Sequence, residues 1–132
     1  MNKPSTKKIL RTTSFTLGLL ILLLVGFITA ISIHVRQIKN KATLICETLN
    51  VGDSLQNIPS KIASLEFSTF LVTSPDGNII KGGKYKKLTT PDIEIKSGSL
   101  IFLIKGYVPY SSSCDIQIKD SIVISKEIFS AG

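Results

Sequence analysis

An uncharged apolar run, Phe15–Ile33, constrains this chain more than any other feature of its sequence. Leu, Ile, Val and Phe dominate the run, and an α-helix built from it would have no polar side. At the helical rise its 19 residues would extend about 28 Å, close to the ~30 Å hydrocarbon core of a bilayer. We therefore predict one transmembrane helix over residues 15–33.

Length and cleavage site decide whether this segment is a permanent anchor. The run exceeds the ~7–15 apolar residues that are usual in a signal peptide. Its one small-x-small sequence, Ala30-Ile31-Ser32, lies inside the run rather than after it. We expect an uncleaved signal anchor, and a cleaved signal peptide is the alternative.

Basic residues flank the run, four before it and three soon after it: Lys3, Lys7, Lys8, Arg11, Arg36, Lys39 and Lys41. This bias predicts that residues 1–14 are a basic cytoplasmic N-terminus and that the domain after the run is exported across the inner (cytoplasmic) membrane. The four basic residues before the run supply more than half of the net charge of +7. Because topology and the lipid bilayer explain this charge, and no aromatic–basic pattern accompanies it, we expect no nucleic-acid partner.

The two cysteines, Cys46 and Cys114, both follow the apolar run. A disulfide between them would close a loop of nearly seventy residues and contribute roughly 4 kcal/mol through loop entropy. Small exported domains are often reinforced in this way, and export supplies the oxidising compartment. We predict the disulfide, with two buried free thiols as the alternative. Two lone cysteines without a histidine in the domain do not indicate a metal site.

After the membrane segment, we expect residues 34–50 to form a helical stalk or linker and residues 51–132 to form one small α+β domain. Apolar residues at helical spacing extend from His34 to Leu49, and a short second helix is expected to start near Pro59.

From Glu66 onward, two-residue alternation and turn residues predict strands. Turns are expected at Ser74–Asn78 and at Asp120–Ser121. The strands are predicted at 67–73, 79–81, 92–96, 99–108, 115–119 and 122–128, with 92–96 half-exposed and 99–108 central. The fold class is therefore α+β: a single N-terminal transmembrane helix, one or two short helices, and an antiparallel sheet of four to six strands.

Gly52-Asp53-Ser54-Leu55 resembles the signature of GDSL-type esterases, which implies Ser54 as a nucleophile. Such a serine needs a base within hydrogen-bond reach. The sole histidine, His34, lies at the membrane boundary, and no Asp-x-x-His sequence follows the motif. We interpret Asp53 and Ser54 as helix-capping residues, and we expect neither an enzyme nor a cofactor.

Four lysines surround a Gly-Gly pair in the segment from Lys81 to Lys87: Lys81, Lys84, Lys86 and Lys87. We interpret this segment as a hairpin loop. Its functional interpretation is contact with anionic lipid headgroups or with an acidic partner. The alternative is a loop whose lysines are only solvated.

Two parts of the chain resemble known families. Ser14-Phe15-Thr16-Leu17 and the long apolar helix after it resemble the N-terminus of type IV pilins and type II secretion pseudopilins. That resemblance implies a leader cut before Phe15 and a helix packed on an antiparallel sheet. Ser14 replaces the usual leader glycine, and Leu19 stands where the family has a glutamate. The segment after Cys46 is similar in outline to SmpA/OmlA-type envelope assembly proteins.

We therefore predict a single-pass, membrane-anchored envelope protein whose small exported domain binds a protein partner as an accessory or adaptor subunit. One alternative is a minor pilin-like structural subunit that polymerises through its apolar helix. Another is a membrane-anchored immunity or inhibitor protein.

Overall fold

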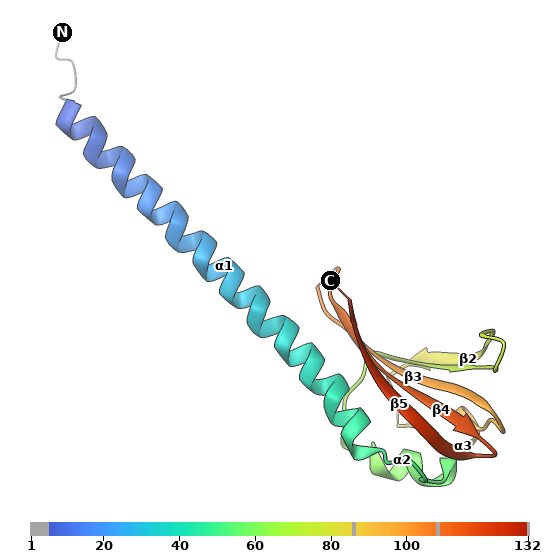
Figure 1. Cartoon of the computed structure of the whole chain (residues 1–132). Coiled ribbons are helices and arrows are strands. Elements are labelled where there is room, and N and C mark those ends of the chain that lie inside the picture. The colour runs from blue at the N-terminus through green and yellow to red at the C-terminus, as the bar shows by residue number, and fades with distance from the viewer. Residues whose placement is uncertain (1–5, 86, 108, 132) are drawn as a thin grey trace. The chain divides into compact units, whose positions relative to one another are not determined.

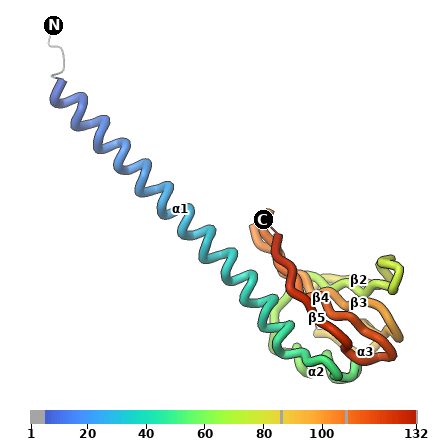
Figure 2. Tube along the Cα trace, viewed as in Figure 1, coloured from blue at the N-terminus to red at the C-terminus, as the bar shows by residue number. Residues whose placement is uncertain are grey.

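The computed structural model describes residues 6–85, 87–107 and 109–131. A long helix, α1 (Thr6–Thr48), precedes a 3₁₀ helix, η1 (Leu55–Asn57), and two short helices, α2 (Ile58–Lys61) and α3 (Thr90–Ile93). The strands are β1 (Thr69–Thr73), β2 (Ile79–Lys84), β3 (Gly98–Lys105), β4 (Ser111–Lys119) and β5 (Ile122–Ala131). Figure 1 labels these elements and Figure 2 traces the chain through them. The predicted α+β class, with a five-stranded antiparallel sheet, is confirmed.

Residues 15–33 of α1 are apolar on every side, and most of their large side chains are exposed. Its threonine hydroxyls donate to carbonyl groups one turn earlier, as Thr29 Oγ1 does to Val25 O at 2.8 Å. Such internal bonds let a helix carry hydroxyl groups through an apolar surrounding. By length and composition, this helix can cross a membrane, a property that it shares with signal sequences. The basic residue Lys3 lies outside the described residues.

The last turns of α1 belong to the compact unit formed by residues 35–132. Apolar residues recur there at helical spacing, as predicted, and one side of the helix is buried: Ile38, Ala42, Ile45 and Cys46, with Leu49 just after it. The helix ends against β5, where Lys126 Nζ donates to Cys46 O at 2.7 Å and to Leu49 O at 2.8 Å. Carbonyl groups at a helix C-terminus have no partner within the helix, and a lysine there also complements the helix dipole.

The strand order is β2-β1-β3-β4-β5, and every neighbouring pair is antiparallel. The predicted central strand corresponds to β3, the middle strand of the sheet. Both predicted hairpin turns are present. Gly77 adopts φ 87° in the first turn, and Asp120 and Ser121 adopt φ 52° and 61° in the second. Two successive residues with positive φ match the twist of a tight hairpin.

The strand predicted at 92–96 is wrong, because Thr90–Ile93 forms the short helix α3. A capping box starts this helix, in which Thr89 N donates to Asp92 Oδ2 at 2.9 Å. Thr89 Oγ1 also donates to the same oxygen at 2.8 Å. Pro91 lies in the first turn, where its missing N–H costs nothing. Ile93 and Ile95 are nevertheless both buried, as their alternation with polar residues predicted, so only the strand conformation is wrong.

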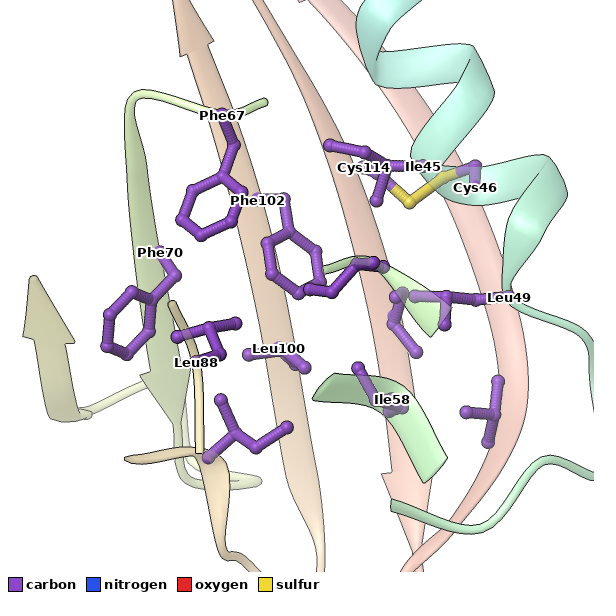
Figure 3. Packing of buried hydrophobic residues seen from close by; sticks show 14 of the residues in the cluster. Ile45, Cys46, Leu49, Ile58, Phe67, Phe70, Leu88, Leu100, Phe102 and Cys114 are labelled. Carbon is purple, nitrogen blue, oxygen red and sulfur yellow. A yellow bond between two sulfur atoms is a disulfide. The ribbon is translucent and has the colours of Figure 1, made fainter. Parts of the chain in front are cut away.

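The core lies between one face of the sheet and the helices. Phe102, Leu100, Cys114 and Ile116 point from the sheet toward side chains of α1 and α2, and Figure 3 shows several of these residues. The Phe67 ring meets the ring of Phe102 edge-on, with centroids 5.2 Å apart. The core therefore joins α1, the short helices and the sheet into one cluster.

Cys46 and Cys114 are joined as a disulfide, as predicted. Their Cα atoms lie 5.6 Å apart and 68 positions apart in the sequence. The bond links the end of α1 to β4, and the yellow bond in Figure 3 marks it inside the core. The described residues contain no free cysteine.

We expect Lys126→Met to destabilise the domain by roughly 1–2 kcal/mol, because two helix-end carbonyl groups lose a charged donor. Urea unfolding of the full chain in detergent, followed by pulse proteolysis, measures the change. Lys119→Met is the matched control, because Lys119 is an exposed lysine at the end of β4. Equal unfolding midpoints for the two variants would show that Lys126 does not hold the helix end.

Candidate functional site

The sheet has two different faces. Along β3, buried residues alternate with half-buried ones, and the buried set faces the helices. The other face, which we call the open face, is formed by half-buried or exposed side chains: Leu71, Ile101, Leu103, Ser113, Asp115, Gln117, Glu127 and Phe129. Phe129 alone exposes 49% of its surface. The open face therefore presents apolar side chains together with carboxyl groups.

Two carboxyl groups lie directly opposite each other on the open face. The strand register pairs Asp115 of β4 with Glu127 of β5, and Ile101 of β3 lies on the other side of Asp115. Like charges at directly opposed positions destabilise a sheet. In addition, Asp115 Oδ1 is buried and has no hydrogen-bond partner among the described residues. Burial raises the pKa of Asp115, and the negative charge of Glu127 raises it further.

A β-bulge creates this arrangement. A regular hairpin from the turn at Asp120 would place Asp115 opposite Lys126, an oppositely charged pair. Instead, the register shifts by one residue between Gln117 and Ile118. The shift moves Lys126 to the helix-covered face, where it binds the end of α1, and it leaves Asp115 opposite Glu127. Bulges commonly re-aim side chains in this way.

The sequence alone did not identify the Asp115–Glu127 pair. The polar residues Ser113, Asp115 and Gln117 alternate with apolar ones, which indicates an uncovered strand face. The partner of each residue on β5, however, depends on the bulge, and the sequence carries no clear signal for it. The alternation could therefore have placed Asp115 on the open face without revealing that Glu127 faces it.

The segment interpreted as a Gly-Gly loop is instead part of strand β2, and that prediction is wrong. The two glycines fit the side chains of the neighbouring strand. A Cβ atom on Gly82 would lie 2.9 Å from Leu71 Cδ2, and one on Gly83 would lie 3.2 Å from Phe70 Cε1. These close approaches favour glycine in a strand.

The predicted lysine site is spread along β2 and beyond its end. Lys81 Nζ donates to Pro91 O at 2.9 Å, which joins β2 to α3. Lys84 and Lys87 are exposed. Lys86 lies outside the described residues. Contact between these lysines and lipid headgroups or an acidic partner stays a prediction.

Asp53 and Ser54 of the GDSL-like sequence lie between the end of α1 and the start of η1. Asp53 Oδ2 accepts hydrogen bonds from Asn50 N at 2.8 Å and from Lys61 Nζ at 2.6 Å. The hydrogen bond from Lys61 lowers the pKa of Asp53, and the bond from Asn50 adds to this effect. Ser54 is the N-cap residue of η1, although its side chain makes no capping hydrogen bond. Ser54 therefore occupies the N-cap position without a side-chain cap, and Asp53 binds Asn50 N and Lys61 instead of capping a helix.

The described residues contain no group of three or more His, Cys, Asp or Glu side chains that could hold a metal ion. Comparisons with protein-family models, with curated proteins and with solved structures find no match to this chain. The likenesses to pilins and to SmpA/OmlA-type proteins therefore stay predictions.

We expect Asp115→Asn to stabilise the domain by roughly 0.5 kcal/mol at pH 7, because it removes a like-charge pair across two strands. The raised pKa of Asp115 means that the folded state binds its proton more tightly than the unfolded state does. The loss of folding stability caused by ionising Asp115 therefore grows as pH rises above 3.8, the ordinary pKa of an aspartate side chain.

The advantage of the variant should disappear in acid below that value, where the wild-type carboxyl group is protonated in both states. Urea midpoints measured from pH 3 to pH 8 check this, and Asp76→Asn in the exposed β1–β2 turn serves as the charge-matched control. A wild type that is more stable than Asp115→Asn at pH 7 would contradict the interpretation.

Proposed function

We propose that this chain is a single-pass membrane protein of the cell envelope whose exported domain binds another protein, as an accessory or adaptor subunit. In this proposal, residues 15–33 are an uncleaved anchor in the inner membrane and residues 1–14 remain in the cytoplasm. The domain acts by binding rather than by catalysis.

The flanking charges and the cysteine pair support this topology in separate ways. The basic residues before the apolar run favour a cytoplasmic N-terminus. The Cys46–Cys114 disulfide favours an oxidising compartment for the domain. A cytoplasmic domain would keep both thiols reduced, so the two arguments agree on export.

The open face is the observation that carries the binding role. It presents half-buried apolar side chains around a carboxyl group that has one buried oxygen without a hydrogen-bond partner in the part of the chain that the structure describes. Such an arrangement costs stability in the isolated domain, and local costs of this kind concentrate at functional sites. A lysine or arginine from a partner would supply the missing hydrogen bond to Asp115 and would offset the repulsion from Glu127.

Photocrosslinking in living cells tests the proposal. Benzoylphenylalanine replaces Gln117, an exposed residue of the open face, in one variant, and Gln56, an exposed residue of η1, in the other. We expect irradiation to join the Gln117 variant to one discrete protein and to leave the Gln56 variant without that product. Adding Asp115→Lys to the Gln117 variant should reduce the yield several-fold, because a cationic partner would then be repelled.

The Gln56 variant distinguishes binding at a defined surface from nonspecific crosslinking. The same product from both positions, or a product whose yield Asp115→Lys leaves unchanged, would contradict binding at the open face. A product that contains only two copies of this chain would instead favour the structural-subunit alternative.

A further inference from the structure

The two edges of the sheet are not equivalent. At the β5 edge, residues just after α1 pair with the strand: Gly52 N donates to Val123 O at 2.7 Å, and Val123 N donates to Asp53 O at 2.9 Å. No described segment pairs with the outer edge of β2. Five of the six β2 residues are exposed and the sixth is half-buried. A bare strand edge is a template for another strand.

The ladder fixes which backbone groups of β2 point outward. Tyr85 N donates to Ser68 O at 3.0 Å, so the carbonyl group of the preceding residue, Lys84, points away from β1. Alternation along an antiparallel strand then directs the N–H and C=O groups of Gly82 and Lys84 outward, while Gly83 pairs with Phe70. Gly82 and Lys84 therefore offer backbone donors and acceptors that no strand of the described sheet pairs with.

The surroundings of this edge are apolar and basic. A groove of about 500 Å³ beside β2 is lined by Phe70, Ile80, Lys81, Gly82, Pro91 and Asp92. Ile80 exposes 52% of its surface there. Lys81 and Lys84 of β2 supply positive charge, whereas the carboxylate of Asp92 already binds Thr89 at the start of α3. An occupant of this edge would meet an apolar groove and a net positive charge.

We propose that β2 is a docking strand for an extended, acidic segment of a partner protein. The segment pairs with the outward backbone groups of Gly82 and Lys84 as a sixth strand of the sheet. Alternate side chains enter the groove beside Ile80, and its carboxylates lie near Lys81 and Lys84. This is strand addition, in which main-chain hydrogen bonds give affinity and side chains give specificity.

The charge argues against a second copy of this chain as the occupant. Pairing β2 with another β2 would bring the lysines of both copies to one edge, and lysines on an edge strand discourage such pairing. This surface is distinct from the open face, so the docking strand does not depend on the binding role proposed above.

The test uses the full chain in nanodiscs of zwitterionic phosphatidylcholine. The probe is the peptide acetyl-Val-Glu-Val-Glu-Val-Glu-amide with a neutral fluorophore, and the comparison peptide has Lys in place of Glu. We expect the Glu peptide to bind roughly tenfold more tightly than the Lys peptide, because its charges complement the lysines. Equal binding of the two peptides would overturn the charge argument.

Two substitutions of Lys84 separate the contribution of its backbone N–H to binding from the contribution of its charge. Lys84→Ala removes the positive charge and should weaken Glu-peptide binding only about threefold. Lys84→Pro also removes the outward N–H, so it should weaken binding roughly tenfold more. Proline is tolerated where a strand N–H faces away from the sheet, and the urea midpoint of the variant verifies that it is folded. Equal effects of the two substitutions would overturn strand addition.

Amide hydrogen exchange of the wild-type chain gives a readout that needs no variant. The Glu peptide should slow exchange at Gly82 and Lys84 and leave Gly83, which already pairs with β1, unchanged. Protection at the open face or at β5 instead would contradict the assignment. Protection of Gly82 and Lys84 at high protein concentration without peptide would show that a second copy is the occupant. A last outcome would favour lipid headgroups over an acidic segment. In it, the chain binds anionic phosphatidylglycerol vesicles but not the peptide, and Lys84→Ala and Lys84→Pro reduce vesicle binding equally.

Discussion

The end of α1 packed against β4 and β5 is the interaction on which the rest of the domain depends. Ile45 and Leu49 are fully buried there, and the Cys46–Cys114 disulfide ties the helix to β4. Lys126 then binds the carbonyl groups at the helix end. A sheet of this size needs a second layer to bury one face, and the last turns of α1 supply much of that layer. The last turns of α1, which continue its apolar part toward the sheet domain, are therefore also part of the domain's core.

The same packing determines which surfaces stay available for binding. The bulge in the last hairpin directs Lys126 toward α1 and, as a consequence, leaves Asp115 opposite Glu127 on the face that no described element covers. The segment after α1 pairs with the start of β5, so β2 remains as the bare edge. The helix end thus accounts for both the open face and the docking strand. The end of α1 packs on one face of the sheet, which leaves the open face available. The segment just after α1 pairs with the β5 edge, which leaves the β2 edge available.

Local patterns in the sequence predicted most of the fold. The helical conformation of the apolar run, the helical spacing before Leu49, both turns and the cysteine pair were all correctly predicted, because each depends on neighbouring residues or on the count of cysteines. The errors occurred where two local signals favour different secondary structures, or where contact with a distant strand determines the structure. At Ile93, a capping box that includes Asp92 overrides two-residue alternation. In the sequence, Gly82 is typical of a loop, but in the structure it lies in a strand where Leu71 leaves no space for a side chain. The opposed carboxyl groups could not be predicted, because one bulge exchanges a favourable cross-strand partner for an unfavourable one.

The central claim is that the disulfide holds the helix end on the sheet outside the cytoplasm. Labelling of intact cells with a membrane-impermeant maleimide tests this most directly, with and without prior treatment by a membrane-impermeant reductant. Our account predicts no labelling of Cys46 or Cys114 in untreated cells and labelling of both after reduction and mild denaturation. Thiols that react without reductant, and only once the membrane has been permeabilised, would place the domain in the cytoplasm and would contradict the account.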